Sequence, residues 1–115
     1  MNKTAKIIIF FLFPLTVVAS EDITEIKILN TEFKVIKIIK NPNELKLAKN
    51  EWGKLVSINS LPNTNWSHKI DITSKSIGGR WLYNKQGYLA KLNKQLKPIY
   101  KVNNVKTFNK VYLGL

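Results

Sequence analysis

The sequence predicts an α+β fold: a single curved antiparallel β-sheet of about five to six strands with two helices packed on one face. Three observations favour it. Residues 66–73 alternate between apolar and polar side chains, as half-buried strands do. Residues 79–92 hold Asn-Lys-Gln-Gly between two further apolar runs, which is typical of a β-hairpin. Two stretches with helical apolar spacing, near 42–56 and 105–115, need a sheet face to cover.

The first twenty residues have the pattern of a secretory signal peptide. Two lysines precede an apolar run over residues 7–15, and small residues end the segment at Ser20. Cleavage there would leave residues 21–115 as a single α+β domain. An uncleaved anchor is the alternative, but a run ending at Ala19 is short for a span of about 20 residues. We therefore expect a periplasmic or secreted protein with no membrane span after cleavage.

Basic charge is concentrated in the second half of the chain. Residues 21–51 hold six lysines and six acidic residues, whereas residues 52–115 hold ten lysines, one arginine and one acidic residue, Asp71. A cationic surface attracts phosphate polymers, acidic lipid head groups or acidic protein faces. The alternative is compositional, because Lys, Asn and Ile are all abundant, as an AT-rich genome would produce without selection for charge.

Local signals place the first elements. Residues 21–40 are rich in β-branched Ile and predict two strands joined by a turn at Asn30-Thr31-Glu32. Asn41-Pro42-Asn43-Glu44 has a capping residue, a proline suited to the first helical position and a glutamate three residues after the cap. This pattern predicts a helix from Pro42 to about Val56, followed by a loop over residues 59–65.

The hairpin sets the expected faces of the sheet. If Asn84–Gly87 form a four-residue loop, Leu82 faces Leu89 and Arg80 faces Lys91 on one side. A short strand near Ile99–Val102 and a final helix after Asn103-Asn104 follow. Both helices are expected to cover the other side, which carries Trp66, Ile70, Ile72, Trp81 and Tyr83.

No stretch carries a catalytic, metal-binding or cofactor-binding pattern, so we expect a protein that is not an enzyme and uses no cofactor. His68 is the only histidine, and on a strand it points away from Asp71, which argues against a triad with Ser67. One histidine, no cysteine and seven scattered acidic residues do not make a zinc site. Nucleic-acid binding is not expected either, because the aromatic rings fall on the core side and arginine is scarce.

The polar side of the hairpin is the candidate partner-binding face. Leucines ringed by cations are unusual on an open sheet, although an ordinary solvated face is the alternative. The candidate residues are Lys69, Arg80, Leu82, Leu89 and Lys91. Asp71 and Arg80 also form a candidate structural pair, in which a bidentate contact would fix strand register; the alternative is two exposed charges worth little.

Three functions are consistent with these features. The first is an exported, non-enzymatic binding protein, of the inhibitor or immunity type, that acts on an unidentified protein through its basic sheet face. The second is an envelope-associated protein that binds anionic lipid or cell-wall polymer through lysines. The third is a small hydrolase, which requires a concave pocket with a carboxylate of perturbed pKa.

Overall fold

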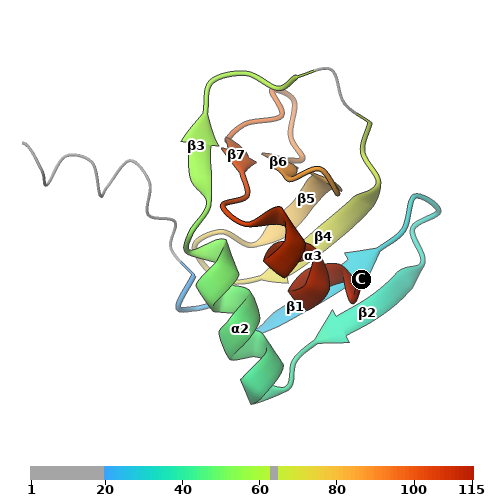
Figure 1. Cartoon of the computed structure of the whole chain (residues 1–115), viewed down its shortest axis with the longest axis vertical. Coiled ribbons are helices and arrows are strands. Elements are labelled where there is room, and N and C mark those ends of the chain that lie inside the picture. Colours follow the sequence, from blue (N-terminus) through green and yellow to red (C-terminus); the bar gives the residue numbers. More distant parts are fainter. Residues whose placement is uncertain (1–19, 63–64) are drawn as a thin grey trace, which may run out of the picture.

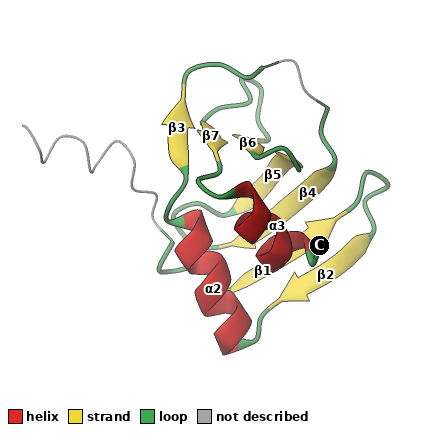
Figure 2. Ribbon diagram, viewed as in Figure 1, coloured by secondary structure: helices red, strands yellow, loops and turns green. Residues whose placement is uncertain are grey.

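The computed structural model describes residues 20–62 and 65–115, so the expected signal peptide lies outside the described residues except for Ser20. The strands form one open antiparallel sheet in the order β2-β1-β4-β5-β6-β7-β3 (Figures 1 and 2). This confirms the α+β fold with two helices, although the sheet has seven strands. The elements are β1 (Glu25–Leu29), β2 (Val35–Ile39), α2 (Pro42–Trp52), β3 (Val56–Ile58), β4 (His68–Thr73), β5 (Gly79–Asn84), β6 (Tyr88–Lys91), β7 (Ile99–Lys101) and α3 (Val105–Leu113).

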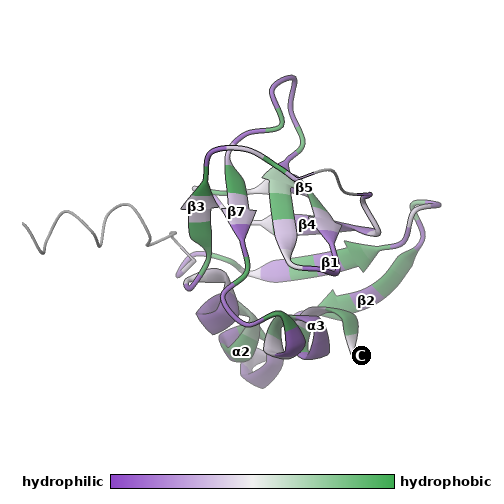
Figure 3. Ribbon diagram, turned by 45° about the horizontal axis from the view of Figure 1, so that its top comes forward, coloured by the Kyte–Doolittle hydropathy of each residue, from purple (hydrophilic) through white to green (hydrophobic). Residues whose placement is uncertain are grey.

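Both helices lie on one face of the sheet, which we call the inner face (Figure 3). Aromatic side chains fill the space between the layers. Trp52 of α2 meets Trp81 of β5 edge to face, with ring centroids 5.2 Å apart, and Phe108 of α3 lies 5.0 Å from Tyr83. The helices therefore cover the side of the sheet that the apolar alternation predicts. Trp66 is different, because it precedes β4, is half-buried and lies outside the core cluster.

The helix starts follow the predicted caps. The Asn41 side chain accepts hydrogen bonds from the backbone N–H groups of Asn43 (2.8 Å) and Glu44 (3.3 Å). The Asn104 side chain caps α3 in the same way, accepting from the Thr107 N–H (3.0 Å). These bonds satisfy N–H groups that have no partner inside the helix.

The predicted end of the first helix is wrong. The helix stops at Trp52, and Val56 begins β3, a short edge strand that the sequence analysis did not predict. Gly53 follows the last helical residue, and glycine disfavours continuing the helix. The N–H groups of Lys54 and Leu55 then bond to carbonyls three residues back, in a tighter turn that buries Leu55 completely.

The predicted hairpin register is also wrong, by one residue. The β5–β6 loop has three residues, Lys85–Gly87, because Asn84 pairs with Tyr88 as the last rung of the ladder. A one-residue shift turns every side chain of β6 to the opposite face. Leu89 therefore faces Tyr83 on the inner face, and Lys91 faces Trp81.

Candidate functional site

The outer face of the sheet, opposite the helices, is the surface on which the sequence places its candidate residues. Strand register gives two central rows on this face that run across neighbouring strands. One row is polar at its centre and consists of Ile38, Lys27, Asp71 and Arg80. The other consists of Val35, Leu29, Lys69, Leu82 and Ala90. Of the five predicted binding residues, this face holds Lys69, Arg80 and Leu82.

The prediction is wrong for Leu89 and Lys91, which do not lie on the outer face. Leu89 is fully buried under the helices, so its side chain cannot reach a partner. Lys91 lies on the inner face, where its Nζ sits 5.1 Å from the Trp81 ring centroid and donates to the carbonyl oxygen of Gly78. Both differences follow from the shorter β5–β6 loop, which turns β6 over.

Asp71 and Arg80 form an ion pair at the centre of the outer face. Nε and Nη2 of Arg80 each lie 2.7 Å from a different Asp71 oxygen, so the contact is bidentate. The hydrogen bonds that Arg80 donates to the Asp71 carboxylate raise the pKa of Arg80 above its ordinary value. Because both side chains are about one-third exposed, the pair contributes about 0.2–1 kcal/mol to stability. The contact joins residues that lie opposite each other on β4 and β5.

Phe33, at the tip of the β1–β2 hairpin, was not among the predicted site residues. Its ring lies 4.0 Å from Nζ of Lys69 and 5.3 Å from the guanidinium carbon of Arg80. Cations within about 6 Å of a ring centroid are attracted by the negative face of the ring. An aromatic side chain therefore joins two of the predicted cations, and we call Phe33, Lys69, Asp71, Arg80 and Leu82 the outer-face site.

The backbone of Phe33 is in the left-handed region, with φ of 64°. Its hairpin uses an asparagine-capped turn: the Asn30 side chain accepts from the Glu32 and Lys34 N–H groups, and Phe33 N–H bonds to the Asn30 carbonyl. Such three-residue loops close with a left-handed residue, which is ordinarily glycine. A bulky residue in this conformation costs about 1–2 kcal/mol.

The same turn occurs elsewhere in the chain and shows how unusual Phe33 is. In the β5–β6 loop the left-handed position is Gly87, where a Cβ would lie 2.7 Å from Cγ2 of Val105. In the turn capped by Asn93 it is Leu96, whose side chain is half-buried. Phe33 combines the strained backbone with a side chain that is 59% exposed. Burial of the Phe33 side chain therefore offsets little of the backbone strain. Strained backbone of this kind is concentrated at functional sites.

Exchanging Phe33 tests whether this strain is real. We expect Phe33→Gly to be more stable than Phe33→Ala by about 1 kcal/mol, because glycine alone relieves the left-handed backbone. Both variants lose the ring, so their difference isolates the backbone. Urea unfolding monitored by tryptophan fluorescence measures it. Equal stability of the two variants would contradict the strain.

Exposed apolar side chains gather beside this site. The described residues include eight large hydrophobic side chains classed as exposed, and four belong to residues 33–38. They are Phe33 (59%), Val35 (47%), Ile36 (50%) and Ile38 (49%). Isolated exposed leucines or valines are normal on a protein surface, but a contiguous group marks an interaction site.

Ser67 and His68 form a pair that resembles part of a catalytic arrangement. Their side chains lie 2.9 Å apart, between Ser67 Oγ and His68 Nδ1. Partial burial and the charge of Lys85 lower the pKa of His68. Asp71 lies on the other face, bound to Arg80, and is not available to orient the imidazole. Among the described residues there is also no cluster of three potential metal ligands.

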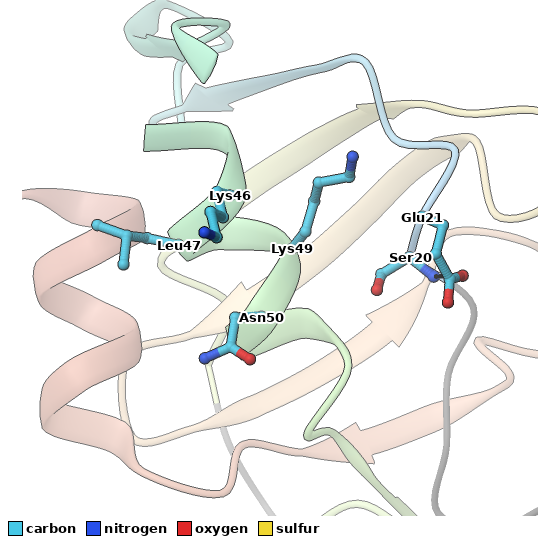
Figure 4. Close-up of a pocket in the computed structure, with 6 residues that line it drawn as sticks. All are labelled: Ser20, Glu21, Lys46, Leu47, Lys49 and Asn50. Atoms are coloured by element: carbon cyan, nitrogen blue, oxygen red, sulfur yellow. Dashed lines mark hydrogen bonds between the residues drawn. The ribbon is translucent and has the colours of Figure 1, made fainter. Parts of the chain in front are cut away.

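A hollow lies beside α2 (Figure 4). Lys46, Leu47, Lys49 and Asn50 form one wall, and Ser20 and Glu21 form the other. Ser20 is the last residue of the expected signal peptide, so cleavage would remove part of that wall. We therefore base no candidate site on this hollow. Neither helix in the described part of the chain is long and apolar enough to cross a membrane.

Comparisons with known proteins were made at three levels. No family model matches the chain, and no curated protein or solved structure matches it either. The function is therefore argued from the geometry of the outer-face site.

Proposed function

We propose that this chain is an exported, non-enzymatic binding protein that docks on an acidic partner protein through its outer-face site. The observation that carries the proposal is Phe33, an exposed ring on a strained backbone beside Lys69 and Arg80. Aromatic and arginine side chains provide much of the binding energy at protein interfaces. The structure keeps such a group on the surface at a cost in stability, which supports a binding role.

The charge of the chain favours an acidic partner. The formal net charge of the whole sequence is +12, and the outer face carries Lys27, Lys69 and Arg80 beside two carboxylates, Asp71 and Glu25. Complementary charge increases the rate of association and selects against partners of like charge. An inhibitor or immunity-type role is the form of binding that we favour, because the outer face of a sheet can block a partner without chemistry of its own. Export is inferred from the N-terminal sequence pattern.

The test begins with the exported protein fraction of the source organism. A bound acidic protein is identified by cross-linking, purified, and titrated against the wild-type chain and its variants. We expect Lys69→Glu and Leu82→Asp each to weaken binding at least tenfold, because both alter the centre of the site. Thermal unfolding of Leu82→Asp verifies that this half-buried position still folds.

Lys106→Glu is the matched control. Lys106 is exposed on α3, on the far side of the sheet, and its substitution changes the net charge as much as Lys69→Glu does. We expect it to change the affinity by no more than about twofold. If Lys106→Glu weakens binding as much as Lys69→Glu, net charge alone is responsible and the site is wrong. Salt-sensitive binding to anionic vesicles or cell-wall polymer, without any acidic protein, would favour the envelope-associated alternative.

A further inference from the structure

We propose that β2 binds an extended acidic segment of the partner protein as an additional strand of the sheet. This inference deepens the proposed function and rests on it, because it describes how the same partner extends beyond the outer-face site. It gives a role to the open edge and the exposed apolar side chains of β2. Neither packing within the protein nor the Asp71–Arg80 ion pair accounts for them.

The position of β2 leaves one of its edges open. β2 is the first strand in the sheet order, and among the described residues it pairs only with β1 (Figure 1). An edge strand presents a row of unpaired N–H and C=O groups, which can pair with an extended peptide. Main-chain hydrogen bonds of this kind provide affinity with little dependence on side chains.

The usual protections against strand addition are weak on β2. Edge strands are commonly short, or carry proline or outward-pointing lysine. The lysine within β2, Lys37, faces the inner side instead, where its Nζ donates to the carbonyl of Val111 (2.8 Å) and lies 3.9 Å from Glu44. The opposite edge, β3, has only three residues. The protective devices present on β2 are the bulge between β1 and β2 and the inward-pointing charge of Lys37.

The surroundings of β2 define the chemistry of its occupant. Val35, Ile36 and Ile38 expose about half of their surface. Apolar side chains of an added strand could therefore pack against them. Lys34 and Lys40 are exposed at the two ends of β2 and match carboxylates on the incoming segment. Residues 21–115 hold 17 basic and 7 acidic residues, a formal net charge of +10, so a second copy of the cleaved chain would be repelled by like charge.

The test uses a synthetic peptide of alternating glutamate and valine, seven residues long, with the purified protein. We expect binding that slows amide hydrogen exchange in residues 35–39 and leaves β3 unaffected. The same peptide N-methylated at every residue cannot donate the backbone hydrogen bonds, and we expect it to bind at least tenfold more weakly. Heptaglutamate measures the contribution of charge alone. Tight binding by heptaglutamate or by the methylated peptide would overturn strand addition.

Variants of the protein locate the peptide. The double substitution Ile36→Thr and Ile38→Thr keeps β-branched side chains on exposed positions, and we expect it to weaken peptide binding about fivefold or more. Val56→Thr makes the same kind of change on β3, where the side chain is 39% exposed, and should have no effect. Protection of β2 in the absence of peptide, together with a dimer in sedimentation, would identify a second copy as the occupant and overturn the proposal.

The partner protein separates this inference from the proposed function. If Lys69→Glu weakens partner binding while the β2 double variant does not, strand addition is wrong and the outer-face site stands. If neither change matters, both proposals fail.

Discussion

Replacing Trp81 by alanine is expected to lower the free energy of unfolding by about 3–5 kcal/mol, the range for deleting a buried tryptophan. Trp81 is 2% exposed and lies at the centre of the layer between sheet and helices. It contacts Trp52 edge to face, and its ring centroid lies 5.8 Å from that of Tyr100. Its indole N–H also donates to the Ile77 carbonyl (3.3 Å). Small domains are stable by only about 5–15 kcal/mol, so this loss removes a large share of the total stability.

Urea unfolding followed by far-ultraviolet circular dichroism measures the loss. Trp66→Ala serves as the control, because Trp66 is half-buried and lies outside the core cluster. We expect its cost to be smaller than that of Trp81→Ala by at least about 1.5 kcal/mol. Similar costs for the two variants would contradict the placement of Trp81 at the centre of the core.

Elements with strong local signals were predictable. The capping pattern around Asn41 and Pro42 located the start of α2, and Asn104 located the start of α3. The alternation of Ile70 and Ile72 with polar residues identified the face that the helices cover. Each signal depends on residues within a few positions of one another, so the sequence contains the information needed. β3 has three residues and no alternation long enough to detect.

The β5–β6 hairpin was harder to predict because its loop length depends on a tertiary choice. Asn84 can end the strand or open the loop, and both versions place Gly87 in the turn. In the structure the Gly87 N–H bonds to the Asn84 carbonyl (2.8 Å), and Gln86 N–H bonds to the Asn84 side chain (2.7 Å). The shorter loop places Leu89 on the inner face, opposite Tyr83, and Ala90 on the outer face, opposite Leu82. A difference of one residue in loop length therefore determines which side of the sheet Leu89 and Lys91 occupy.

Phe33 could not be predicted from propensity, because phenylalanine is among the residues least expected at positive φ. A signal was nevertheless present. The segments Asn30–Lys34, Asn84–Tyr88 and Asn93–Lys97 share an asparagine followed two residues later by Glu or Gln. All three form asparagine-capped turns with a left-handed fourth residue. Comparing Phe33 with Gly87 at the equivalent position would have identified it as unusual.

At alkaline pH, buried tyrosines are expected to unfold the protein. Burial raises the pKa of Tyr112 well above its ordinary value, and the charge of Glu51 adds to the effect. Burial also raises the pKa values of Tyr83 and Tyr100. In the unfolded chain these groups ionise near pH 10, whereas the folded chain keeps them protonated to higher pH. The stabilisation is therefore complete below about pH 10 and is lost as the pH rises through the folded-state values.

The expected slope is a loss of about 1.4 kcal/mol per pH unit for each tyrosine that ionises only on unfolding. Urea unfolding between pH 9 and pH 11.5 measures it. Tyr112→Phe removes the hydrogen bond to the Ala48 carbonyl (2.6 Å), so it should lower the free energy of unfolding by about 1 kcal/mol at pH 7. It should also remove the contribution of one tyrosine, about 1.4 kcal/mol per pH unit, from the alkaline slope. Tyr88→Phe alters a half-buried ring outside the core cluster and serves as the control. An unchanged slope in Tyr112→Phe would mean that the hydroxyl of Tyr112 ionises without unfolding, and that its burial between α2 and α3 is not maintained in solution.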